Sequence, residues 1–209
     1  APPSPLATLR FFATDPVVLW GVVVFGAIEF GAVALLPVWA VRSGLTEGES
    51  VMVMASFAAG AILFAPLLGW MADRFDRRRL LLAAGAGSAA APLAMIALAP
   101  ALWPVIGCGV LWGAAAVGLY TLALTELGAR YAGARLAEGN AAVVFAYGLG
   151  ALVSPVALGQ AMDAVPPDGL LWLAAAAALG YALLALVRIR TRPRPPGPPP
   201  LDSADETGR

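Results

Sequence analysis

The sequence predicts an all-α polytopic membrane protein with six transmembrane helices. Of its 209 residues, 60% are hydrophobic and only 12% are charged, whereas a soluble domain carries about 25% charged residues. Six separate apolar runs also approach the ~20 residues that a helix needs to cross a hydrocarbon core about 30 Å thick. A chain of this length could not hide so many runs in one soluble core, so the class is a membrane protein.

The six expected spans follow one another with short polar links. Asp15 and Pro16 mark the start of the first span, with Asp15 as the N-cap and Pro16 at the first helical position. Residues 1–15 are expected to be a linker with a short amphipathic lead-in, 16–188 the membrane domain, and 189–209 a disordered Pro-rich tail. The chain looks like a piece of a longer protein. The expected spans are Pro16–Val41, Val51–Ala72, Leu80–Leu98, Trp103–Thr125, Asn140–Met162 and Leu170–Val187.

The basic residues predict how the chain is oriented. All 13 are arginines, and six spans place twelve of them on one side of the membrane. The other side has Arg42 alone, among the acidic residues Glu47, Glu49, Asp163 and Asp168. Because basic residues collect on the cytoplasmic side of a membrane, both termini are expected in the cytoplasm. The membrane itself is expected to be a bacterial inner membrane.

Several classes of function are excluded by composition. The chain has no His and one cysteine, Cys108. This rules out intrachain disulfides, Cys/His zinc sites, histidine-dependent triads and histidine-ligated haem. We therefore expect no enzyme activity, no cofactor and no metal. The lipid bilayer and a small-molecule substrate are the expected partners, and nucleic acid is not.

An internal repeat relates the two halves of the chain. A shift of ninety residues places Gly60 on Gly150, Gly69 on Gly159 and Asp73 on Asp163. Each copy holds three spans, an odd number, so the two copies must be inverted relative to each other in the membrane. The expected fold is thus two inverted three-helix repeats.

The link between the second and third spans carries a recognisable motif. Gly69-x-x-x-Asp73-Arg74-x-Asp76-Arg77-Arg78 resembles motif A of the major facilitator superfamily, at the place in a six-helix half where that family has it. Asp76 stands where the family usually has Gly, whose positive φ in a tight turn Asp tolerates better than most residues. The resemblance covers residues 16–188 and implies half of a major facilitator fold, built from inverted repeats.

Further features imply the carboxy-terminal half of a twelve-helix transporter. The fourth span lacks an intramembrane Arg, and the fifth carries Gly150-x-x-x-Ser154-Pro155, which is loosely similar to an antiporter motif of the family. The partner would be the other six-helix half of the same protein. The resemblance also implies a conformational latch, assigned to Gly69, Asp73, Arg74, Arg77 and Arg78; an alternative for Arg78 and for Arg79 is anchoring on anionic lipid.

Glu29 is the sharpest single signal, because it lies midway along the first span. An acidic residue there costs about 2.5–3.5 kcal/mol on insertion scales. It is expected to couple transport to protons or to contact substrate, or alternatively to form a structural hydrogen bond between helices. Gly26 and Ala32, on neighbouring turns, leave room for a partner helix or a cavity.

Polar residues in two other spans could complete a cavity. Asn140, Tyr147 and Ser154 recur every seven residues, which puts them near one helical face, and Tyr120 and Thr121 lie in the fourth span. Each could instead be an ordinary hydrogen bond between helices. Together these features favour proton-coupled export of a small organic solute by alternating access. The alternative is a non-transporting six-helix scaffold or regulatory subunit.

Overall fold

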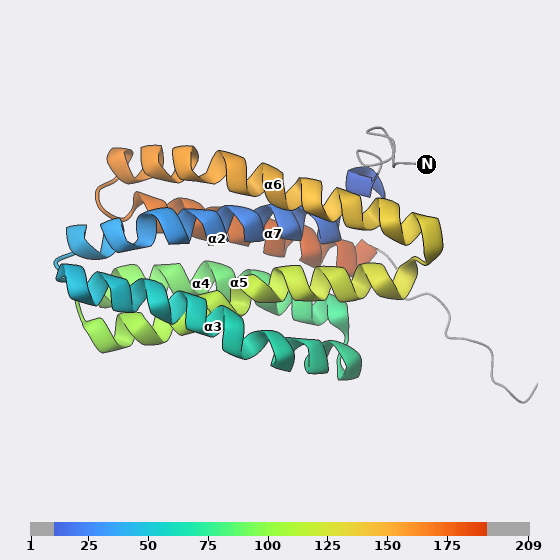
Figure 1. Cartoon of the computed structure of the whole chain (residues 1–209), viewed down its shortest axis with the longest axis horizontal. Coiled ribbons are helices and arrows are strands. Elements are labelled where there is room, and N and C mark those ends of the chain that lie inside the picture. Colours follow the sequence, from blue (N-terminus) through green and yellow to red (C-terminus); the bar gives the residue numbers. More distant parts are fainter. Residues whose placement is uncertain (1–10, 192–209) are drawn as a thin grey trace, which may run out of the picture.

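The computed structural model describes residues 11–191. Residues 11–14 form one helical turn, and the expected linker before them and most of the tail lie outside the described residues. Within the described chain, six helices are long and apolar enough to cross a membrane. They run side by side along one axis (Figure 1), as the sequence predicts. Their bounds are α2 Pro16–Arg42, α3 Glu47–Arg74, α4 Arg77–Leu98, α5 Leu102–Arg130, α6 Gly133–Ala164 and α7 Gly169–Thr191.

Most of the helices extend past the expected apolar spans at one or both ends. The first turn of α3 is polar, and its residues cap the helix. Thr46 and Glu49 form a reciprocal capping box, in which each side chain accepts from the other residue's backbone N–H. At the other end of the bundle, Asp76 caps α4 by accepting from the backbone N–H of Arg78. Polar side chains thus satisfy the terminal backbone groups of helices that continue beyond the apolar core.

The helices form two layers. Four of them neighbour one another in the order α6, α2, α5, α3, while α4 and α7 pack together behind this layer. The edges of the bundle are therefore α6 and α3, which lie at opposite sides (Figure 1). The most extensive packing joins α2 to α6 and α5 to α3. Each of these pairs combines the first helix of one repeat with the second helix of the other.

Close contacts between helix backbones confirm the inverted repeat. A Cβ atom at Gly60 in α3 would collide with the carbonyl oxygen of Val110 in α5. The same contact recurs between Gly150 in α6 and the carbonyl oxygen of Val23 in α2. Gly150 lies 90 residues after Gly60, and Val110 lies 87 residues after Val23.

A second pair of contacts obeys the same two offsets. Gly113 in α5 abuts the carbonyl oxygen of Phe57 in α3, and Gly26 in α2 abuts the carbonyl oxygen of Tyr147 in α6. The helix pairs α3–α5 and α2–α6 are therefore two copies of one interface. This reciprocity is what two inverted three-helix repeats require.

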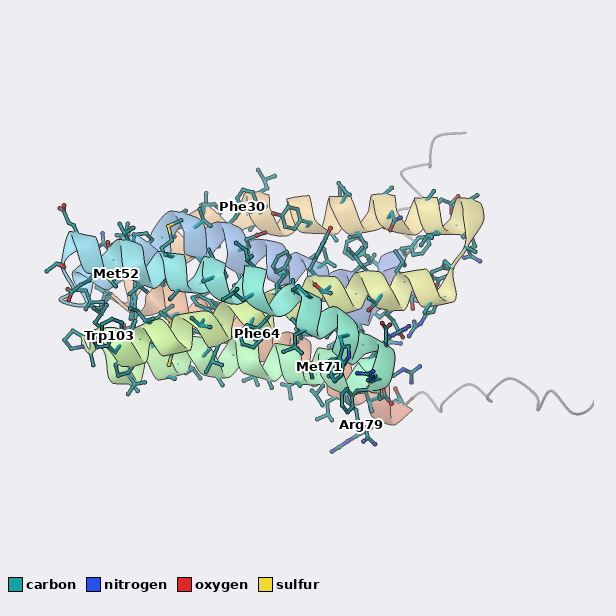
Figure 2. The ribbon with its side chains drawn as sticks, turned by 60° about the horizontal axis from the view of Figure 1, so that its bottom comes forward. Phe30, Met52, Phe64, Met71, Arg79 and Trp103 are labelled. Atoms are coloured by element: carbon teal, nitrogen blue, oxygen red, sulfur yellow. The ribbon has the colours of Figure 1, made fainter. Side chains whose placement is uncertain are left out.

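The two ends of the bundle carry different polar contacts. At the end where α2 stops, Arg42 pairs with Asp163 at 3.4 Å, and Trp39 Nε1 donates to Asp168 at 2.9 Å. The other end is where α2 begins, α7 ends and the α3–α4 link turns (Figure 1). Eight arginines of the described residues belong to it: Arg74, Arg77, Arg78, Arg79, Arg130, Arg135, Arg188 and Arg190. Arg79 and Trp103 mark these opposite ends in Figure 2.

Candidate functional site

Glu29 is the middle residue of α2, with thirteen helical residues on each side. At 1.5 Å per residue it lies about 20 Å from either end of the helix. The other Asp, Glu and Arg side chains of the described residues lie between helices or within the first or last six residues of one. Glu29 is half-buried. Within residues 11–191, the middle of the bundle therefore holds one ionisable carboxyl group and no arginine.

Tyr147 is the hydrogen-bond partner of Glu29. Its hydroxyl donates to Glu29 Oε2 at 2.7 Å, which joins α6 to α2. Gly26, almost one turn before Glu29, lets the backbone of α6 approach at Tyr147, since a side chain there would meet the Tyr147 carbonyl oxygen. The small residue next to Glu29 thus makes room for a partner helix, as the sequence predicts.

Three further aromatic rings surround the ring of Tyr147. Tyr147 lies at the centre, with ring centroids 5.9 Å from Phe25, 5.9 Å from Phe30 and 6.3 Å from Tyr120. Phe25 and Tyr120 are also in contact, at 5.3 Å. We call these four residues the aromatic cluster. Phe25 is buried, whereas Phe30 is 45% exposed and lies midway along the bundle (Figure 2).

The other residues expected in the cavity are placed differently. Asn140 and Ser154 lie seven residues on either side of Tyr147, which is about 10 Å away along α6. Asn140 is exposed, and the buried Ser154 hydroxyl donates to the Ala151 carbonyl of its own helix at 3.5 Å. Thr121 is half-buried beside Tyr120. The structure thus brings Glu29, Tyr147 and Tyr120 together and leaves Asn140 and Ser154 apart from them.

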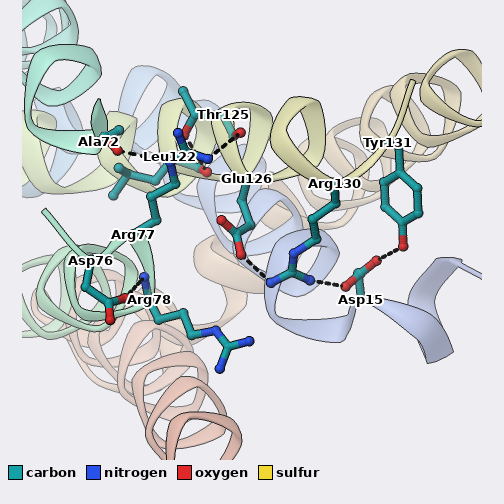
Figure 3. Close-up of polar contacts among 10 residues, drawn as sticks. All are labelled: Asp15, Ala72, Asp76, Arg77, Arg78, Leu122, Thr125, Glu126, Arg130 and Tyr131. Atoms are coloured by element: carbon teal, nitrogen blue, oxygen red, sulfur yellow. Dashed lines mark hydrogen bonds and ion pairs between the residues drawn. The ribbon is translucent and has the colours of Figure 1, made fainter. Parts of the chain in front are cut away.

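The link between α3 and α4 is held mainly by Arg77. Its Nε donates to the Ala72 carbonyl at 3.0 Å and its Nη1 to the Thr125 carbonyl of α5 at 3.4 Å (Figure 3). Asp73 is 77% exposed and meets Arg77 Nη2 only at 4.0 Å, so it pairs with an arginine and caps no helix in the described chain. Asp76 has φ −64°, so the expectation of a positive φ at this position is wrong. It acts as a helix cap, which needs an extended backbone.

Arg74 and the glycine of the motif lie on the outside of α3. The Arg74 guanidinium stacks 4.2 Å from the centroid of the Trp70 ring. A Cβ atom at Gly69 would have no neighbour within 4 Å, and the same holds for its repeat counterpart Gly159. Asp163, the counterpart of Asp73, is 76% exposed. Both glycines of the Gly-x-x-x-Asp copies therefore face away from this bundle, and both carboxylates are largely exposed although each lies near an arginine.

A buried polar network at the arginine-rich end escaped sequence reasoning. Asp15 occupies the N-cap of α2, as expected, but its side chain makes no capping hydrogen bond. Instead it accepts from Arg130 and from the hydroxyl of Tyr131, while Arg130 also pairs with Glu126 (Figure 3). Burial and the hydrogen bond to the Asp15 carboxylate raise the pKa of the Tyr131 phenol, which keeps it a donor. The network ties the start of α2 to the end of α5.

The fold and its central carboxyl group define a polytopic membrane protein made of one pair of inverted three-helix repeats. The Major Facilitator Superfamily profile matches residues 18–207, so the chain belongs to that family. Membership of this family, together with a relative that is named as a transporter, supports a membrane transporter rather than an enzyme. The chain is also similar to an uncharacterized MFS-type transporter, YfkF, of Bacillus subtilis strain 168. The two are 26% identical over 136 residues, which are 65% of this chain and 34% of that protein. The chain thus spans about a third of the length of this relative.

Proposed function

We propose that this chain forms one six-helix half of a secondary active transporter that works by alternating access. Its partner would be a second six-helix half of the same protein, and the present chain would be the carboxy-terminal one. The edge helices α3 and α6 support this arrangement because they expose large apolar residues at repeat-related positions. Ile62 is 72% exposed and Leu152 is 77% exposed. Such surfaces suit either lipid or a second bundle.

The observation that carries the function is the position of Glu29. Transporters built from inverted repeats bind substrate and coupling ions near the bilayer midplane, and Glu29 lies at mid-depth of α2. A carboxyl group can take up and release a proton there, and the described chain offers no arginine to neutralise it at that depth. We therefore assign proton coupling to Glu29, with export of a small organic solute as the transport reaction.

The orientation follows from charge. Arg74, Arg77, Arg78, Arg79 and Arg130 lie at one end of the bundle, which we assign to the cytoplasm of a bacterial cell. The measurement is cysteine labelling with a membrane-impermeant maleimide after replacement of the buried Cys108. Val165→Cys, at the α6–α7 link, should react in intact cells. Phe75→Cys, at the α3–α4 link, should react only after permeabilisation, and the reverse pattern would refute this orientation.

Transport itself is tested with the full-length protein in liposomes under an imposed pH gradient. Uptake of labelled organic cations, anions and neutral solutes should show at least one compound whose movement depends on the gradient. Glu29→Gln keeps the size of the side chain but cannot exchange a proton, so gradient-driven uptake should fall to the passive level. Glu47→Gln, an exposed carboxylate in the first turn of α3, is the matched control and should behave like wild type.

Two results would count against the proposal. Gradient-driven uptake that survives Glu29→Gln would remove the coupling role of Glu29. Failure of every compound to move, with folded protein in the liposomes, would favour the alternative of a scaffold or regulatory subunit.

A further inference from the structure

The charge at mid-depth is unbalanced within this chain. Glu29 is the one Asp, Glu or Arg of the described residues that lies more than six residues from a helix end. Arg42, the nearest basic residue along α2, is thirteen residues away, or about 20 Å along the helix. Tyr147 donates one hydrogen bond to the carboxylate but brings no positive charge. A carboxylate at mid-depth of a membrane helix is costly without a cation even when it is half-buried, so this place favours a positively charged occupant.

The rings around Glu29 favour the same kind of occupant. Aromatic faces carry negative potential and attract cations within about 6 Å of the ring centroid. The aromatic cluster brings together four rings from three helices, with neighbouring centroids 5.3–6.3 Å apart, and its central ring, Tyr147, hydrogen-bonds the Glu29 carboxyl group. Phe30 is partly exposed, so the cluster is open on one side. Rings of this kind also bury large apolar surfaces.

We propose that Glu29 and the aromatic cluster form a binding site for a hydrophobic organic cation, with the carboxylate pairing the charge and the rings packing the apolar body. This rests on the proposed function, since the cation would be the transported solute. An anion would be repelled by Glu29, and the described residues offer it no arginine at this depth. The same carboxyl group can hold either a proton or the cation, so the two would compete for it.

The probe for this site is tetraphenylphosphonium, and its anionic match is tetraphenylborate, which has nearly the same size and shape. Saturable binding of radiolabelled tetraphenylphosphonium to the purified full-length protein is measured by equilibrium dialysis in detergent. Wild type should bind the cation saturably. Labelled tetraphenylborate is dialysed in a separate experiment, because the two ions form a poorly soluble salt, and it should show no saturable binding. Glu29→Gln should weaken binding by about tenfold or more, the effect of losing one desolvated ion pair.

The rings are tested one at a time. Tyr147→Leu and Phe30→Leu should each weaken binding by about two- to thirtyfold, the range of a single cation–π contact. The controls are Glu47→Gln and Trp103→Leu, which change an exposed carboxylate and a 73% exposed ring near helix ends. Both should leave the dissociation constant unchanged. Thermal unfolding of each variant identifies any that fails to fold, and Phe30, on the surface, gives a variant that keeps the core intact.

Three results would overturn the cation site: no saturable binding of tetraphenylphosphonium, equally tight saturable binding of tetraphenylborate, or unchanged binding of tetraphenylphosphonium in folded Glu29→Gln. These outcomes are separate from those of the transport assay. Gradient-driven uptake of a neutral or anionic compound with no cation binding would remove the substrate class and leave the transporter in place. Glu29-dependent cation binding without any uptake would support the cation site and count against the transport function.

Discussion

Glycines determine where the helix backbones of this bundle touch. Gly60 and Gly150 each lie against a carbonyl oxygen of a helix from the other repeat, and Gly113 and Gly26 form the second such pair. Gly148, on the same helix as Gly150, has no atom within 4 Å of where its Cβ would be. Two glycines that look alike in the sequence thus have different roles. At Gly150 a methyl group is costly because the atom that it would meet belongs to a backbone, which cannot move aside as the end of a flexible side chain can.

This difference gives a prediction for α6. Gly150→Ala should lower the free energy of unfolding by about 1–3 kcal/mol, the typical cost of overpacking a close contact, because its Cβ would strike the Val23 carbonyl. Gly148→Ala should be neutral or slightly stabilising, since Ala is the better helix former. Thermal unfolding in detergent measures both. Equal stability of the two variants would show that the α2–α6 interface relaxes to accept a methyl group.

At the scale of the elements, the sequence predicts the helices better than their contacts. Apolar runs locate all six helices because the membrane sets a minimum length for each of them. The ends differ by several residues, most at α6, which begins at Gly133 instead of the expected Asn140. Its first turns carry Arg135 and Glu138, which an apolar-run criterion leaves out although a helix can continue into the polar interface.

The candidate site was partly predictable for a related reason. Glu29 is found from the sequence alone because a mid-span carboxylate is costly, and Tyr147 and Tyr120 follow as polar residues of other spans. The partner of Asp15 could not be found in this way. Its N-cap position is a local signal, whereas its contact with Arg130 depends on α2 and α5 being neighbours. Phe30 was also missed, because nothing in its own helix distinguishes it from a lipid-facing residue.

At the scale of the whole molecule, the edge of the bundle formed by α3 exposes residues that are free to contact a second six-helix half. Gly69 and Asp73 lie one turn apart on that edge. A Cβ atom at Gly69 would have no neighbour within 4 Å, and Asp73 is largely exposed. Arg77, by contrast, is engaged in holding α4 against α3 and α5. We therefore propose that the latch contacts are made by Gly69 and Asp73, while Arg77 braces the link.

A bulky side chain at Gly69 tests the latch without disturbing the contacts of Arg77 that brace the α3–α4 link. Gly69→Leu in the full-length protein should slow transport by about tenfold or more, which a clash of roughly 1.4 kcal/mol in one conformation would produce, with unfolding unchanged. Gly180→Leu on α7, where a Cβ also has no neighbour within 4 Å, is the control and should transport normally. Asp73→Asn should slow transport as well. Normal rates in both Gly69→Leu and Asp73→Asn would refute the latch.

The glycine contacts also make the stiffness of the bundle uneven. Where two backbones touch, no side chain can change rotamer to let the helices slide, so α2–α6 and α3–α5 should each move as a rigid beam. The seam between α2 and α5 has side chains in it, among them the stacked rings of Phe25 and Tyr120. Elastic deformation of the half should concentrate there. A solute bound against those rings would lie where the two helix pairs move relative to each other, and its presence would oppose that movement.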